Sequence, residues 1–586
     1  MFETDQKSRT IRILDIAFML GGIAILIIFT TLYLMPFRLD DVLHMDWARE
    51  HSFWDAFDVN RGEIVRSVRP VFAITIWLLT HTAGIDHYFP WHFVLVGSFL
   101  IGLAYAGKTA RYITKDNTAL YFTAGFFWLA FLPILNVLFW YGDLTFTLEL
   151  MFVAPAWYYG LRGILEGRIG IWIVAILCGI LAVLAKEPAL LLVHSIFIGT
   201  FILFFKEIKI AWQKKSIYHK IFALALYLIF LLISLKLYLA SPTRSNRFFK
   251  IDSLSHDQLM FFITDRLRYY GEALLNPIAR ILLVTPLLYS LLRNFTRKNL
   301  TLLSCFAIFT LSAFLAFFVI KSVIVFSLVL LATPLHNIFR KNDRTINILI
   351  LLFNIIAIII LGVLTVTVML VKTQLTELSF VLLVSSGVYW AQLTKEIIVS
   401  IKPYWKKKNV RYIIMSVSIL SIIGVIYTAA PVIKAKELLL REVRDTRDNA
   451  NDAIKWMATN LQSGSALLVT APSLYGLGIA DEMTSKDDEY KLYVQYTFLQ
   501  GYIRSYFEML HRKDISLGFL EDSVQLSAIL DSCRSAGDFF LFLQTGLDAD
   551  RFHSTINGKN QLKKNDSLLV KFTSGPFPSE VWKLEK

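Results

Sequence analysis

The segment Thr345–Val371 reads TINILILLFNIIAIIILGVLTVTVMLV and contains no charged residue. At 1.5 Å per residue, a helix of this length extends for roughly 40 Å, which is enough to cross the ~30 Å hydrocarbon core of a membrane. Arg344 and Lys372 flank the run. A surface helix of a soluble protein keeps one polar face, and this run has none, so it predicts a transmembrane helix.

The same pattern recurs along most of the chain. Of its 586 residues, 56% are hydrophobic and 18% are charged, and the mean hydropathy is +0.56. Soluble proteins average about 45–50% apolar and about 25% charged residues, so a soluble, disordered or disulfide-based chain is excluded. Further apolar runs lie near 14–36, 91–107, 118–139, 144–161, 169–185, 188–205, 218–240, 272–292, 299–320, 322–339, 377–393 and 411–431.

The distribution of charge predicts the orientation of these runs. The chain carries +14 overall, with +16 before residue 432 and −2 from there onward. The basic residues lie in short loops between apolar runs, which is the positive-inside pattern of a membrane protein and not a nucleic-acid groove. Thirteen spans place these loops consistently in the cytoplasm, together with the N-terminus. The stretch 70–83 is too short to span, and we expect it to form an interfacial or re-entrant helix.

Two domains follow from this arrangement. Residues 1–431 form the predicted transmembrane domain, with long outer loops at 37–69 and 241–271. Residues 432–586 form a predicted soluble α/β domain outside the cytoplasm, with helices over 434–461 and 490–510 and strands at Ala466–Thr470, Phe539–Gln544 and Leu568–Phe572. The fold class is therefore a polytopic α-helical membrane protein with an extracytoplasmic α/β domain, in a bacterial inner membrane by default.

Ionisable residues within or next to the apolar runs indicate a site. An ionised side chain in hydrocarbon costs several kcal/mol unless it is paired or hydrated. In the thirteen-span arrangement these residues fall in the outer half of the membrane, and a polar cavity open to the outside explains their common depth. The expected cavity residues are Asp143, Glu149, Lys186, Glu187 and Arg280 from the spans, and Arg66, Arg244, Arg247, Tyr269 and Tyr270 from the two outer loops.

The sharpest local signal is the pair Asp40-Asp41, directly after the first apolar run. Adjacent carboxylates at this boundary can act as a general base or hold a divalent metal. The alternative is a helix cap, because Asp is a good N-cap residue. Three cysteines, Cys178, Cys305 and Cys533, indicate neither a disulfide nor a metal cluster.

Several short motifs together resemble the GT-C superfamily of membrane glycosyltransferases, in the branch that contains the protein mannosyltransferases and the lipid A aminoarabinose transferase. That branch has an acidic pair after the first span, an Ala-Arg-Glu-like helix, a basic residue before proline and a Lys-x-Pro turn between two spans. In this chain the matching residues are Asp40-Asp41, Ala48-Arg49-Glu50, Arg69-Pro70 and Lys186-Glu187-Pro188.

The resemblance implies an activity and residue roles. Such enzymes transfer a sugar, here a hexose or pentose, from a polyprenyl-phosphate carrier to a lipid, polysaccharide or protein acceptor outside the cytoplasm. The resemblance implies inversion, with Asp40 as general base and Asp41 assisting. Arg69, Lys186, Arg244 and Arg247 would bind the donor phosphate, because cationic side chains stabilise a phosphate leaving group. No cofactor is required, although Asp40 and Asp41 would hold a divalent cation, Mg²⁺ or Mn²⁺, if one is used.

Two other classes remain open on the sequence alone. A transporter or flippase of a lipid-linked sugar would also place charges in the membrane, although nearer its midplane. A lipid-linked oligosaccharide ligase or polymerase would use related chemistry with diphosphate donors.

Overall fold

A computed structural model describes most of the apolar part of the chain and the strands of the C-terminal part. The described residues are 16, 18–30, 39–57, 69–84, 87–126, 128, 131, 133–134, 137–139, 141–213, 215–240, 263–264, 267–268, 277–295, 301–320, 322–339, 343–365, 375–401, 434, 452–470, 507, 511–512, 514–520, 531–532, 539–544, 563–573 and 579–585. The chain divides into two compact units. The first comprises Met1–Leu34, Trp54–Thr75 and Phe89–Ala430, and the second comprises Met35–Phe53, Ile76–Tyr88 and Pro431–Lys586.

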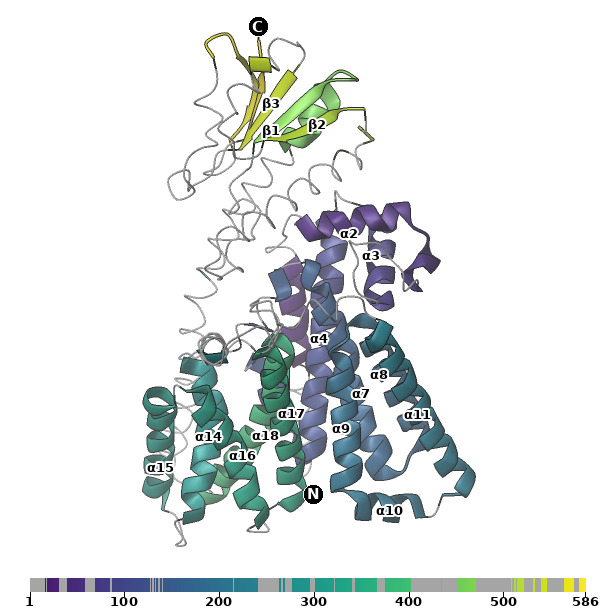
Figure 1. Cartoon of the computed structure of the whole chain (residues 1–586). Coiled ribbons are helices and arrows are strands. Elements are labelled where there is room, and N and C mark those ends of the chain that lie inside the picture. The colour runs from purple at the N-terminus through teal and green to yellow at the C-terminus, as the bar shows by residue number, and fades with distance from the viewer. Residues whose placement is uncertain are drawn as a thin grey trace. The chain divides into compact units, whose positions relative to one another are not determined.

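The first unit is a helical bundle (Figure 1). Its first described helix covers Phe18–Thr30. Its helices are α4 (Tyr88–Thr114), α5 (Asn117–Tyr121), α7 (Leu144–Glu166), α8 (Ile169–Ala185), α9 (Ala189–Leu203), α10 (Phe205–Gln213), α11 (Ile217–Ala240), α14 (Pro277–Phe295), α15 (Leu302–Phe314), α16 (Val323–Phe339), α17 (Arg344–Thr365) and α18 (Thr376–Ile401).

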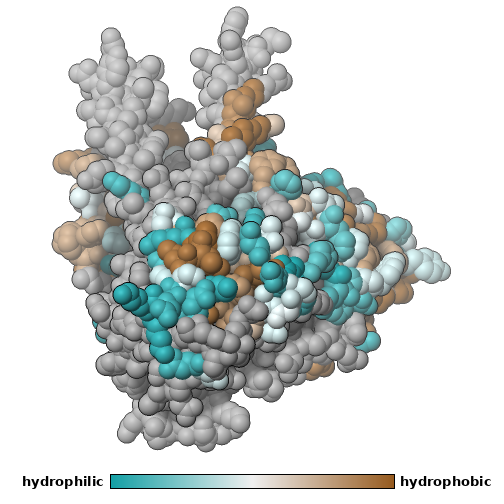
Figure 2. Space-filling model, turned by 90° about the horizontal axis from the view of Figure 1, so that it is seen from above, coloured by the Kyte–Doolittle hydropathy of each residue, from teal (hydrophilic) through white to brown (hydrophobic). Residues whose placement is uncertain are grey.

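By length and apolar composition, α4, α11 and α17 can each cross a membrane, and so can α9 and α10 if the two form one bent span. Many described helices expose large apolar side chains; Leu232, Ile324 and Phe306 are 66%, 62% and 59% exposed. Such exposure is expected where lipid replaces water. Figure 2 shows one end of the molecule, where hydrophilic side chains lie among hydrophobic ones. The exact number of thirteen spans stays a prediction, and the run 411–431 lies outside the described residues.

The run 118–139, predicted as one span, is broken. It contains α5, a π-helical turn η2 (Phe122–Phe126) and a 3-10 turn η4 (Val137–Phe139). A further 3-10 turn, η5 (Tyr141–Asp143), leads directly into α7. Gly125 and Pro133 lie in the run, and both residue types disfavour a continuous helix. Apolar composition alone could not reveal this interruption.

Buried tryptophans join neighbouring helices through their indole N–H groups. Trp157 of α7 donates to the Leu192 carbonyl of α9 at 3.0 Å, and Trp172 of α8 donates to the Ala223 carbonyl of α11 at 3.2 Å. Trp390 of α18, which is half-buried, donates to the Leu282 carbonyl of α14 in the same way. A buried indole N–H needs such a partner, so each of these contacts fixes one helix against another.

The helix α10 departs from the common direction. It turns by 82° from α9 and lies across the ends of its neighbours (Figure 1). Trp212 donates its indole N–H to the Ile164 carbonyl at the end of α7, which fastens α10 to that helix. Residues 206–220 contain five lysines and one glutamate, so this corner of the bundle is basic. Its cytoplasmic location stays a prediction.

The second unit contains a five-stranded sheet in the order β2-β1-β3-β5-β4. Strands β1 (Ala466–Thr470), β2 (Ser516–Leu520) and β3 (Phe539–Gln544) pair in parallel, and β5 (Ser579–Lys583) runs antiparallel to β3 and to β4 (Ser567–Phe572). Parallel neighbours need crossover connections. A helix over 452–460 precedes β1, so the described residues here combine a helix with a mixed sheet. The predicted helix over 490–510 lies almost entirely outside the described residues.

The second unit also contains α2 (Leu39–Glu50). A short helix η1 (Phe53–Phe57) follows it, and α3 (Pro70–Thr82) begins in the first unit and ends in the second. The 13-residue length of α3 matches the short helix expected over 70–83. Trp77 of α3 donates to the His51 carbonyl at 3.1 Å and packs edge-on against Phe53.

Candidate functional site

The turn Lys186-Glu187-Pro188 between α8 and α9 is the centre of the candidate site. Proline cannot continue α8, and the residue before a proline avoids helical backbone angles. The residue before Pro188 is Glu187, and α8 ends before it: Lys186 caps α8 with an extended backbone, and Pro188 caps the start of α9. The local sequence therefore projects two charged side chains from a tight turn between two apolar helices.

The Lys186 ammonium is held by two carboxyl groups. Its Nζ atom lies 2.5 Å from Oε1 of Glu377 and 3.7 Å from Oε2 of Glu149. The Phe146 ring lies beneath the ammonium, with 3.0 Å between Nζ and the ring centroid. The side chains of Lys186, Glu377 and Glu149 are 9%, 6% and 0% exposed, so this is a buried ionic cluster.

Helix geometry sets the positions of the two carboxyl groups. Glu149 lies on α7, whose backbone approaches α4 closely at Gly102, where a Cβ atom would be 2.9 Å from the Leu150 carbonyl. Glu377 is in the first turn of α18, where the positive end of the helix dipole stabilises a carboxylate. Thr376 next to it donates to the Pro133 carbonyl at 3.2 Å and anchors this end of α18.

A second ion pair adjoins the cluster through Glu187. Arg69 donates from Nε at 3.1 Å and from Nη2 at 3.0 Å to Oε2 of Glu187. Arg69 immediately precedes α3, so its position depends on the start of that helix. The structure thus brings Arg69, Lys186, Glu149 and Glu187 of the sequence prediction to one place.

Glu377 is the residue that the sequence analysis missed. It begins the apolar run 377–393, and a charge at the start of a run is the same signal that singled out Asp143. Its role becomes visible only through its contact with Lys186, because the two residues are 191 positions apart.

The other predicted residues have different surroundings. Asp143 is buried and ends η5, directly before α7. Arg280 of α14 donates to the Phe317 carbonyl at 2.9 Å, in the π-helical turn η7 (Leu315–Val319). Asp41 is buried in α2, which belongs to the second unit. The side chain of Asp40 lies outside the described part of the chain, as do Arg66, Arg244, Arg247, Tyr269 and Tyr270.

The described residues form no group of three His, Cys, Asp or Glu side chains that could hold a metal ion. The sequence analysis names Asp40 and Asp41 as the pair that would hold a divalent cation. The side chain of Asp41 is described and that of Asp40 is not, so the metal requirement stays a prediction.

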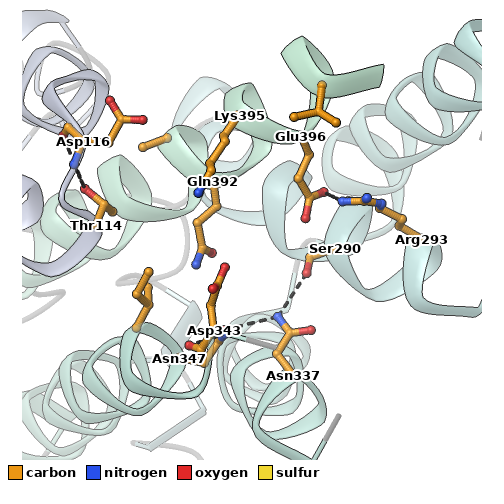
Figure 3. A pocket seen from close by; sticks show the side chains of 13 residues that line it. Thr114, Asp116, Ser290, Arg293, Asn337, Asp343, Asn347, Gln392, Lys395 and Glu396 are labelled. Carbon is orange, nitrogen blue, oxygen red and sulfur yellow. Dashed lines mark hydrogen bonds and ion pairs between the residues drawn. The ribbon is translucent and has the colours of Figure 1, made fainter. Parts of the chain in front are cut away.

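A separate polar cavity of about 210 Å³ lies at the other end of α18 (Figure 3). Glu396 and Glu377 are 19 residues apart on this helix, which is about 28 Å at helical rise. Arg293 of α14 pairs with Glu396, and Asn337 donates to Ser290 at 3.1 Å and to Asn347 at 3.2 Å. Acidic, basic and amide groups all line it, so its charge favours neither an anion nor a cation.

The helices and the sheet define the class of protein: a polytopic helical membrane protein with a small α/β domain. No protein-family model matches the chain, and no curated protein matches it. In structure the chain is similar to ArnT from Cupriavidus metallidurans bound to undecaprenyl phosphate, at 12% identity and a TM-score of 0.45 over 96% of this chain and 98% of that one.

Proposed function

We propose that the chain is a membrane glycosyltransferase that transfers a sugar from a polyprenyl-phosphate donor to an acceptor at the outer face of a bacterial inner membrane. The observation that supports this function best is the convergence of Arg69 and Lys186. Arg69 donates two hydrogen bonds to Glu187, the residue next to Lys186, although 118 positions separate Arg69 from Glu187. Two cations at one apolar helix boundary suit a phosphate whose prenyl chain lies in lipid.

The proposed reaction is a single displacement. Asp40 removes the proton from the acceptor hydroxyl, the acceptor oxygen bonds to the anomeric carbon with inversion, and the bond to the phosphate oxygen breaks. Lys186 and Arg69 stabilise the charge on the departing polyprenyl phosphate, with Arg244 and Arg247 from the second outer loop. Electrostatic stabilisation of this kind is often the largest contribution to catalysis. The reaction needs no metal ion.

A reconstituted transfer assay tests the proposal. The full chain in liposomes receives a polyprenyl-phosphoryl sugar with a radiolabel on the sugar, and labelled acceptor is recovered from outer-membrane lipid or protein extracts. We expect transfer by the wild type to persist in EDTA. Asp40→Asn should lower the transfer rate at least about 10²-fold while donor binding is kept. Glu207→Gln changes an exposed carboxylate of α10, which has no proposed role, and should retain the rate.

Three results would contradict the proposal. Sugar transport across the liposome membrane without a labelled product would identify a transporter. Activity only with diphosphate-linked chains would identify a ligase or polymerase. Full transfer by Asp40→Asn would remove this residue from its role as general base.

A further inference from the structure

The two carboxyl groups around Lys186 outnumber the cation that they share. Glu149 comes from α7 and Glu377 from α18, and both face the Lys186 ammonium. Arg69 and Glu187 form the neighbouring ion pair. With every group ionised, Lys186, Glu149 and Glu377 together carry a net charge of −1. An excess charge in such a buried place is costly unless a proton or another ion neutralises it.

Glu149 and Glu377 lie close together because both contact one ammonium, at 3.7 and 2.5 Å from Lys186 Nζ. Two carboxyl groups that face one cation can share a proton, because a carboxylic acid donates a hydrogen bond to a carboxylate whereas two carboxylates repel each other. The pair is therefore a built-in proton acceptor beside Lys186. No other charged group of α7, α18 or the α8–α9 turn is recorded in contact with this ammonium among the described residues.

A phosphate group cannot join this arrangement without a change. It brings a further negative charge, and the Lys186 ammonium is already engaged at 2.5 Å by Glu377. Binding requires that the phosphate oxygen replace the Glu377 oxygen at Nζ. The released carboxyl group then lies beside Glu149 and an anion, and a proton there restores the original charge of the site.

We propose that phosphate binding at Lys186 is coupled to the uptake of one proton by the Glu149–Glu377 pair, and that Glu377 is a positioning residue that holds Lys186 until the phosphate arrives. This inference rests on the proposed function, because it takes Lys186 as a phosphate ligand. No covalent bond to carbon or phosphorus changes in this step. Solvent supplies the proton, and the anion and the proton cancel in charge.

The first experiment measures binding by the full-length wild type in detergent or nanodiscs. The probe is undecaprenyl methyl phosphate, a phosphodiester; a phosphate monoester is unsuitable because its own second pKa is about 6. Coupling predicts that affinity weakens with rising pH, by up to about tenfold per pH unit once the pair is deprotonated. Calorimetry in two buffers of different ionisation enthalpy should show the uptake of about one proton per bound probe.

The second experiment uses Glu377→Gln, which removes one of the two carboxyl groups. We expect its affinity to vary little with pH and to exceed that of the wild type at about pH 8.5 by about tenfold. Glu207→Gln removes an exposed carboxylate of α10 and should keep the pH profile of the wild type. If Glu377→Gln does not fold, the calorimetric proton count on the wild type decides the question.

The outcomes separate this inference from the function on which it rests. Binding by the wild type with no pH dependence and no proton uptake overturns the coupling and leaves the transferase intact. A pH dependence that Glu377→Gln retains overturns the assignment to this pair. The absence of probe binding at every pH overturns the phosphate site itself, and the coupling with it.

Discussion

Arg69 and Glu187 lie 118 positions apart, and two hydrogen bonds of 3.1 and 3.0 Å join the guanidinium of Arg69 to a single carboxylate oxygen of Glu187. The contact ties the start of α3 to the turn between α8 and α9. Both side chains are mostly buried, with 17% and 10% exposed. Arg69, which precedes α3, therefore helps to fix the turn that carries Lys186.

The first prediction concerns this pair. Arg69→Gln and Glu187→Gln should each destabilise the protein by about 1–3 kcal/mol, because each leaves a partly buried polar group without its charged partner. The double variant should cost less than the two single changes added together. Thermal unfolding of all four proteins in detergent gives the coupling. Simple additivity would show that the contact contributes nothing to stability.

The second prediction concerns Lys186. Lys186→Met leaves Glu149 and Glu377 facing each other without a cation, and removing one partner of a buried pair costs about 3–5 kcal/mol. We expect a large fall in the thermal midpoint and a loss of donor binding. Lys206→Met removes an exposed lysine of α10 and should have little effect. Equal stability of the two variants would contradict the buried cluster.

The third prediction uses two glycines of the same helix. An alanine at Gly102 would bring its Cβ atom to 2.9 Å from the Leu150 backbone, whereas nothing lies within 4 Å of a Cβ atom at Gly97. Gly102→Ala should destabilise the protein by about 1–3 kcal/mol through overpacking. Gly97→Ala should be neutral or stabilising by up to about 1 kcal/mol, because alanine favours a helix. The difference between their thermal midpoints is the measurement.

The fourth prediction concerns acid stability of the second unit. Arg512 donates to both carboxylate oxygens of Asp514, at 2.9 and 3.0 Å, and these hydrogen bonds lower the pKa of Asp514 to about 2. A lowered pKa stabilises the folded state above the unfolded value of about 3.9, and this contribution disappears as the pH falls to about 2. The stability difference between wild type and Asp514→Asn should therefore be constant above about pH 5 and shrink below about pH 4. A difference that persists at the lowest pH would contradict this account.

The fifth prediction concerns topology. In a variant without native cysteines, a cysteine at Ser216, after α10, should react with a membrane-impermeant reagent only from the cytoplasmic side. A cysteine at Asn565, next to β4, should react only from the opposite side. Labelling of both positions from one side would overturn the thirteen-span arrangement and the extracytoplasmic location of residues 432–586.

Much of the helical part could be predicted because charges mark its boundaries. Arg168 and Lys186 bracket the run 169–185, and α8 occupies Ile169–Ala185. The strands β1 and β3 also have the predicted bounds, because short apolar runs end at polar residues there. The strand β2 escaped prediction, since SLGFL is short and contains a glycine.

The contacts of the candidate site could be predicted only in part. Charges in apolar runs drew attention to Glu149 and Lys186, since such charges are costly wherever they lie. Their partners could not be found in the same way. A single sequence carries no information on which helices become neighbours, so the contact between Glu377 and Lys186 had no sequence signal beyond the charge itself. The link between the acids of α2 and this cluster stays a prediction.

The exposure of helix α11 has a consequence for its sequence. Only 17% of its most apolar 18 residues are buried. It is attached to the bundle by the Ala223 carbonyl, which accepts a hydrogen bond from Trp172. The hydroxyl groups of Tyr227 and Ser234 also contact the two ring nitrogens of His194. In a membrane, the remaining perimeter would face acyl chains, which discriminate poorly among leucine, isoleucine and phenylalanine. Over evolutionary time, this helix should therefore drift freely along most of its circumference and stay constant along one narrow stripe.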